Sequence, residues 1–254
     1  MQRALLLHQT SIGKKAIVAV TGVVMFGFLV GHMAGNFQVL IFPPEKINEY
    51  AAFLKHTPSL LWGTRTVLLL SVIAHIYFSM MLASEASDAR PHAYAKRVNN
   101  ATNLAAISMR LSGPTIALFI VYHLLHLTFG FMPRAAGPFS ETDVYANLTN
   151  SFQLWWLAVI YIVAQLMLGL HLFHGAWSFF QTLGLNHPRY NAFRRYFAIG
   201  ITALIVGGNI AIPTTILAKK LLGDSTTTDG AEGETVDGEA AAGEPSAAPD
   251  TEGE

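Results

Sequence analysis

The chain has 254 residues, of which 52% are hydrophobic and only 13% are charged. An ordinary soluble domain has about 25% charged residues, so this composition argues against a soluble protein, and we expect no nucleic-acid partner. The chain has no cysteine, which excludes disulfides and thiolate metal ligands. The formal net charge is zero, but ten of the sixteen acidic residues follow Leu222.

Five long segments of the chain contain no Asp, Glu, Lys or Arg. A helix needs about 20 apolar residues to cross a hydrocarbon layer of about 30 Å, and each segment is long enough. The predicted transmembrane helices overlap these segments and, in chain order, cover residues 16–40, 60–85, 108–131, 152–180 and 195–220. Lipid cannot satisfy a free backbone amide, which favours helices. The sequence therefore predicts an all-α membrane protein, a five-helix transmembrane bundle.

Two parts are predicted along the chain. Residues 1–222 form the transmembrane domain, and residues 223–254 form an acidic tail rich in Ala, Gly, Pro and Thr. The tail lacks a hydrophobic period, so we expect it to be disordered. Within the spans, Pro114 is predicted in the first turn of the third helix, and Pro213 is expected to kink the fifth. We find no internal repeat in the sequence.

The distribution of Lys and Arg predicts the orientation in the membrane. The segments on the N-terminal side of the predicted bundle hold ten of these residues, and those on the opposite side hold six. Positive residues are enriched in cytoplasmic loops. The bias predicts a cytoplasmic N-terminus and a C-terminus outside.

Ten histidines are the main chemical feature of the sequence. Four fall in loops or at helix ends and should be solvated: His8, His56, His92 and His187. The other six lie within predicted spans: His32, His75, His123, His126, His171 and His174. One buried histidine is more often a hydrogen-bond partner between helices. Six on four helices favour a shared function, because ionisable groups at membrane depth are costly.

Depth sorts four of these histidines into two pairs. At 1.5 Å per residue, His32 lies roughly 24 Å from the inner face, and His123 reaches nearly the same level. His75 and His171 lie on inward-running helices, and both fall in the inner half. The two levels differ by roughly 15 Å. Two imidazoles on opposite helices at one depth can ligate a haem iron axially, and two such sites would form an electron relay.

Other interpretations of the histidines stay open. A zinc or copper site is less well supported, because no carboxylate, cysteine or third histidine is evident at either level. A proton relay would more naturally include an intramembrane Asp or Glu. His126 and His174 each follow a chosen ligand by three residues, so either could replace its neighbour, bond a haem propionate or serve a quinone.

Short motifs surround the paired histidines: Thr21-Gly22 before His32, Ala74-His75, Arg110-Leu-Ser-Gly113 before Tyr122-His123, and Leu170-His171-Leu-Phe-His-Gly-Ala-Trp-Ser178. These motifs resemble those of the cytochrome b subunit of succinate:quinone oxidoreductases, the b558-type subunit of succinate dehydrogenases and fumarate reductases. The resemblance is to the class that holds two haems on one polypeptide. It covers residues 10–220, which include all five predicted spans.

The resemblance implies that the bundle encloses two stacked haems b, with the ligands His32, His75, His123 and His171. It thereby favours the first histidine of each closely spaced pair. It also implies a flavoprotein with FAD and an iron–sulfur protein on the cytoplasmic face of a bacterial inner membrane. A membrane quinone, menaquinone or ubiquinone, would be the other electron carrier. FAD and the iron–sulfur clusters would belong to the partners, and this chain would hold no catalytic residue for dicarboxylate chemistry.

Further residues are candidates for contacts with the cofactors. Lys14, Lys15 and Arg110 lie at the predicted inner edge, where they could pair with haem propionates or anchor to lipid headgroups. Ser112, His126 and His174 are further candidate cofactor contacts. Asn36, Gln38 and Glu49, near the outer end of the first span, are candidate quinone contacts, although interfacial solvation would also explain them.

One position departs from the family pattern. Some fumarate reductases of this class carry a Glu two residues before the fourth ligand, linked to transmembrane proton transfer, and this chain has Gly169 there. The departure puts that proton path in doubt and favours succinate oxidation over fumarate reduction. Two alternatives to this function are a cytochrome b of a hydrogenase or formate dehydrogenase and a histidine-lined metal or proton transporter.

Overall fold

The computed structural model describes residues 7–89, 104–185 and 187–231. The contacts of the chain divide it into two units, 1–218 and 219–254, and all packing described here is within the first. Several features of the sequence lie outside the described residues: Arg3, Arg90, His92, Lys96, Arg97 and the tail from residue 232 onward.

The long helices are α1 (Ser11–Ile41), α3 (Pro58–Asp88), α4 (Leu104–His123), α6 (Trp155–Thr182) and α7 (Asn191–Ala231). A single π-helical turn, η2 (Leu124–Thr128), extends α4. Among the described residues, five helices are long and apolar enough to cross a membrane. The predicted all-α fold with five membrane-spanning helices is therefore confirmed.

Some predicted boundaries differ from the structure. Pro114 lies in the interior of α4, because that helix begins before the predicted start at 108. The helix α7 continues to Ala231, so residues 223–231 of the predicted disordered tail are helical. No proline follows Pro213 before residue 245, and each residue added to an existing helix gains a backbone hydrogen bond.

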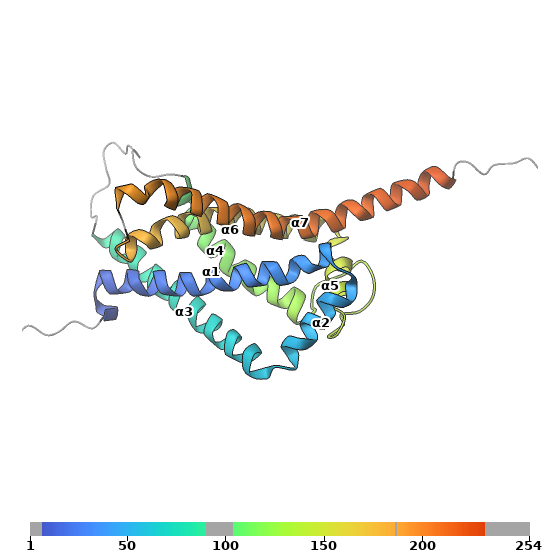
Figure 1. Ribbon diagram of the computed structural model, residues 1–254, viewed down its shortest axis with the longest axis horizontal. Helices are drawn as coiled ribbons and strands as arrows, with labels where there is room; N and C mark the ends of the chain where they lie inside the picture. The colour runs from blue at the N-terminus through green and yellow to red at the C-terminus, as the bar shows by residue number, and fades with distance from the viewer. Residues whose placement is uncertain (1–6, 90–103, 186, 232–254) are drawn as a thin grey trace, which may run out of the picture. The chain divides into compact units, whose positions relative to one another are not determined.

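Two short helices that the sequence did not predict lie together at one end of the bundle (Figure 1): α2 (Pro44–Lys55) and α5 (Val144–Phe152). Pro44 begins α2 at a position where a missing N–H costs nothing. Asp143 caps α5 by accepting a hydrogen bond from the backbone N–H of Ala146 at 2.9 Å. The Asn48 side chain links the two helices, donating to Asp143 Oδ1 at 3.1 Å. We call the end of the bundle where α2 and α5 lie the capped end.

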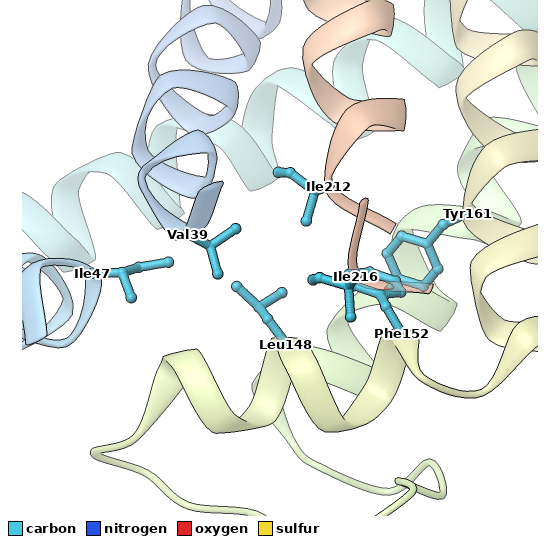
Figure 2. Close-up of a cluster of buried hydrophobic side chains, with 7 residues drawn as sticks. All are labelled: Val39, Ile47, Leu148, Phe152, Tyr161, Ile212 and Ile216. Carbon is cyan, nitrogen blue, oxygen red and sulfur yellow. The ribbon is translucent and has the colours of Figure 1, made fainter. Parts of the chain in front are cut away.

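Buried side chains of the core gather at the capped end. They come from α1, α2, α5, α6 and α7, and Figure 2 shows them converging: Val39, Ile47, Leu148, Phe152, Tyr161, Ile212 and Ile216. Along the rest of the bundle, α1 packs on α3 and α4 packs on α6. The outward face of α3 is apolar and exposed, for example at Leu69 and Leu70. A long helix with an exposed apolar face fits contact with lipid.

A charged side chain is also buried between α6 and α7. Arg194 is 1% exposed, and its guanidinium carbon lies 4.6 Å from the ring centroid of Trp177. The same guanidinium donates to the Trp177 carbonyl and to Asn191 Oδ1, each at 3.2 Å. The stacked ring and these acceptors offset the cost of burying the charge.

Two glycines after η2 test how tightly the capped end is packed. Gly130 has a φ of +71°, and a Cβ there would lie 2.4 Å from Cγ of Phe139. Gly137 has a φ of +68° but open space around it. Gly137→Ala should cost about 1–2 kcal/mol from backbone strain, and Gly130→Ala should cost more because the clash adds to the strain. Thermal unfolding of the detergent-solubilised protein measures both, and an equal loss would contradict the tight packing at Phe139.

Candidate functional site

The structure brings the four paired histidines together in the groups that depth predicted. His32 on α1 faces His123 at the end of α4, with ring centroids 5.7 Å apart and ring planes at 85°. His75 on α3 faces His171 on α6, with centroids 6.2 Å apart and planes at 55°. We call these the first and second histidine pairs. Each pair therefore joins helices from the two packed pairs α1/α3 and α4/α6.

The separation within each pair is suited to one shared metal ion. A metal–imidazole bond is about 2 Å long, so two rings that bind one ion from opposite sides have centroids about 6 Å apart. Both measured separations are close to this value. In the described part of the chain, no group of three or more His, Cys, Asp or Glu side chains is placed to hold a metal. Two nitrogen donors per site suit axial ligation of a macrocycle better than a tetrahedral zinc site.

In the second pair, hydrogen bonds define which nitrogen of His75 is available. Its Nδ1 lies 3.1 Å from the Val18 carbonyl oxygen and 3.1 Å from the Thr21 hydroxyl. A carbonyl only accepts, so we assign the hydrogen to Nδ1. The opposite nitrogen, Nε2, then has a free lone pair. Histidines that bind metals are commonly held in this way, with the other ring nitrogen bonded to a backbone carbonyl.

The partner ring in the second pair is held by a longer contact. Ser112 is fully buried on α4, and its hydroxyl lies 3.5 Å from Nδ1 of His171. Ser112, predicted as a cofactor contact, thus lies beside a histidine of the second pair. His174 is half-buried one turn further along α6 and, among the described residues, belongs to neither close pair.

In the first pair, a chain of hydrogen bonds runs from His123 toward the capped end. The Tyr161 hydroxyl lies 3.3 Å from Nδ1 of His123 and 2.9 Å from Nδ1 of His126. The other nitrogen of His126 lies 2.9 Å from the Ser151 hydroxyl on α5. That hydroxyl donates to the backbone carbonyl of Asn147 at 2.6 Å. We call this series the Tyr161 chain.

The direction of each bond in the Tyr161 chain follows from its last acceptor. Ser151 donates to a carbonyl, so its oxygen accepts from Nε2–H of His126. Nδ1 of His126 is then an acceptor, and the Tyr161 hydroxyl donates to it. The Tyr161 oxygen accepts in turn from Nδ1–H of His123, which leaves Nε2 of His123 free. Because both nitrogens of His126 are engaged, the geometry favours His123 over His126 as the ligand.

His32 differs from the other three paired histidines. The Asn36 side-chain amide lies 3.2 Å from Nε2 of His32 and donates to the His32 carbonyl at 2.8 Å. A metal ion bound at Nε2 would have to replace this amide. Asn36, a predicted quinone contact, is therefore a partner of His32 in the structure. The ring of Phe28 stacks on His32 with centroids 5.1 Å apart.

The two halves of the site share a short repeat, although no internal repeat was predicted from the sequence. Each half has a hydroxyl residue and a glycine, a phenylalanine seven residues after the hydroxyl, and a histidine eleven residues after it: Thr21-Gly22, Phe28 and His32, then Ser112-Gly113, Phe119 and His123. Eleven residues are about three helical turns, so these side chains share a face. Each hydroxyl contacts the histidine of the helix packed beside it. The pattern is short, and the contacts between helices show that its two copies occupy equivalent positions.

Apolar space beside the first pair tests whether a flat cofactor suits the site. A groove of about 470 Å³ lies between α1 and α3, within the usual size of cofactor pockets. Phe28, which stacks on His32, forms part of its wall, and Gly63 leaves it open on α3. The lining is almost wholly apolar. The two-nitrogen donor set fits a porphyrin, and the groove borders the first pair through Phe28.

The predicted propionate contacts lie in different surroundings. The Lys14 side chain is buried and forms an ion pair with Glu85 on α3. Lys15 and Arg110 are exposed. Lys14 therefore already has a protein partner that bridges α1 and α3.

The remaining predicted polar contacts do not converge on one site. Glu49 is exposed on α2 and pairs with Lys46 at 2.7 Å, whereas Gln38 is half-buried on α1. The loop histidines within the described residues are exposed as predicted: His8, His56 and His187.

No family model, curated protein or solved structure matches this chain. The resemblance to cytochrome b subunits therefore stays a prediction, and the function is inferred from the site itself.

Replacing the second histidine of each closely spaced pair tests the roles that the Tyr161 chain indicates. His126→Ala should destabilise the protein by about 2–4 kcal/mol, because it opens a cavity and leaves the Tyr161 and Ser151 hydroxyls with one partner fewer. His174→Ala, the matched change at a half-buried position, should cost much less. Thermal unfolding in detergent measures both. A larger loss from His174→Ala would point to His174 as a ligand instead.

Proposed function

We propose that this chain is the membrane-anchor cytochrome b subunit of a succinate:quinone oxidoreductase. Two haems b would be held by His32 with His123 and by His75 with His171. The observation that carries the proposal is the two facing histidine pairs between four apolar helices. Each haem iron, when bound, takes up and releases one electron.

The neighbours of the ligands support this role. The Val18 carbonyl and the Thr21 hydroxyl hold the hydrogen of His75 on Nδ1, and Tyr161 does the same for His123. A ligand held in this way keeps its orientation and becomes a stronger electron donor to a metal. The surrounding apolar helices would keep water from the two centres.

The motifs and the charge bias supply the rest of the proposed assembly. A cytoplasmic N-terminus would put the second pair near the cytoplasmic face and the first pair near the outer face of a bacterial inner membrane. The iron–sulfur protein and the FAD-bearing flavoprotein would dock on the cytoplasmic face, and the flavoprotein would carry out the dicarboxylate chemistry. This chain would pass electrons between the iron–sulfur protein and a membrane quinone, either menaquinone or ubiquinone.

The surroundings of Gly169 support succinate oxidation as the direction. A Cβ added there would lie 3.3 Å from Cγ2 of Val206, so α6 and α7 approach closely at this point. A side chain at this position, such as the Glu that some fumarate reductases carry, would require Val206 to shift slightly. The chain therefore lacks the acidic group at this point.

A haem count on the purified complex tests the proposed cofactor. A dithionite-reduced difference spectrum should show low-spin haem b at two haems per chain. His75→Ala should reduce the count to one, because it removes one axial ligand of the second pair. His56→Ala, which changes an exposed histidine at the end of α2, should leave both haems in place. Two haems in the His75→Ala complex would show that this ligand assignment is wrong.

The identity of the soluble partners needs a separate measurement. The complex purified from its native membrane through this chain should reduce quinone when succinate is added. Hydrogen- or formate-dependent quinone reduction without succinate activity would instead assign the chain to another membrane oxidoreductase. Metal uptake into vesicles by a haem-free chain would support the transporter alternative.

A further inference from the structure

In the proposed function Tyr161 orients His123, and the rest of the Tyr161 chain has no role. We infer that Tyr161 is a positioning residue for the first haem: by accepting the Nδ1 hydrogen of His123, it lowers the reduction potential of that centre. The inference rests on the proposed function, because it concerns a haem held by His123.

The far end of the Tyr161 chain lies on α5, at the capped end. The Asn147 carbonyl that accepts from Ser151 belongs to α5. The Asn147 side chain is itself tied down, because it donates to the Ser140 carbonyl at 2.6 Å and accepts from the Ser140 N–H at 3.0 Å. The Tyr161 chain therefore ends at a fixed backbone acceptor. The direction of its hydrogen bonds cannot reverse without breaking the bond to that carbonyl.

Packing holds the Tyr161 hydroxyl between its two histidine partners. The Tyr161 ring is 6% exposed and belongs to the buried cluster in Figure 2. Its centroid lies 4.9 Å from that of Phe152 and 5.0 Å from that of Phe119, both in edge-to-face contact. His126 and Ser151 are fully buried. Water therefore cannot compete for these hydrogen bonds, and in such surroundings they polarise one another.

The effect on the first centre follows from the charge on the iron. An acceptor on Nδ1–H makes the imidazole a stronger electron donor through Nε2. A stronger donor stabilises ferric iron over ferrous iron, which lowers the reduction potential. In the first pair, a hydrogen bond at Nδ1 supports His123. The contact of Asn36 with His32 is to Nε2 instead. Tyr161 thus links the hydrogen bonds of the capped end to the electron-donating strength of His123.

The test removes one oxygen atom from Tyr161 and compares the result with the same change at a neighbouring tyrosine. Tyr161→Phe should keep two haems per chain and reduce the ferric-over-ferrous preference of the first haem about tenfold. That change is an increase of about 59 mV for a one-electron couple. The second haem should not shift. Potentiometric titration of the purified complex, followed at the haem absorbance, measures both centres, and the His75→Ala complex identifies the first.

The matched control is Tyr122→Phe. The ring centroid of Tyr122 lies 6.2 Å from that of Tyr161, and among the described residues its buried hydroxyl has no hydrogen-bond partner. Removing that hydroxyl should leave both potentials unchanged. Ser151→Ala breaks the chain one link further away, so it should raise the potential of the first haem by a smaller amount. If Tyr161→Phe fails to assemble, this variant carries the test.

Equal potentials of the first haem in the Tyr161→Phe and Tyr122→Phe complexes would overturn the inference, as would a parallel shift of both haems. In those cases the wild-type complex still holds two haems, and the proposed function stands. A wild-type complex without low-spin haem would overturn the proposed function and this inference together.

Discussion

The constraint on which this site depends is the cost of placing an imidazole inside an apolar bundle. A buried polar nitrogen without a partner costs about 1–3 kcal/mol, and lipid offers no substitute for water. Three of the paired histidines meet this constraint through Nδ1, with the partners Val18 and Thr21, Ser112, or Tyr161. For His75 and His123 the same bonds leave Nε2 available to a ligand. In these rings, one hydrogen bond at Nδ1 both satisfies a buried nitrogen and leaves the other nitrogen free to bind a metal.

The short repeat shows how the fold meets this task twice. On α1 and on α4, a hydroxyl lies three turns before a histidine, and each hydroxyl contacts the histidine of the adjacent helix. Each of these two helices thus supplies a ring to one level and a supporting hydroxyl to the other. The two levels, roughly 15 Å apart, are built from the same two helix faces, so a rotation of either helix would disturb both pairs at once.

Hydrogen bonds connect the first histidine pair to the capped end. Helix α5 contributes Ser151 and the Asn147 carbonyl, and α2 is tied to α5 through Asn48 and Asp143. The hydrogen-bonded surroundings of His123 therefore extend into a segment outside the long helices. The Tyr161 chain therefore connects α5 to His123 through Ser151, His126 and Tyr161.

Hydropathy and helical rise, which are local properties, were enough to predict the five long helices and the grouping of His32 with His123 and His75 with His171. Depth and spacing could not choose between His123 and His126, because three residues on a helix separate them by less than a turn, and only the family resemblance favoured His123. That choice follows from Tyr161 and Ser151, which lie 38 and 28 residues beyond His123 in the chain. The ion pair of Lys14 with Glu85 and the contact of Ser112 with His171 are likewise contacts between helices. Tertiary structure decided these features, because side-chain partners on different helices leave no period in the sequence.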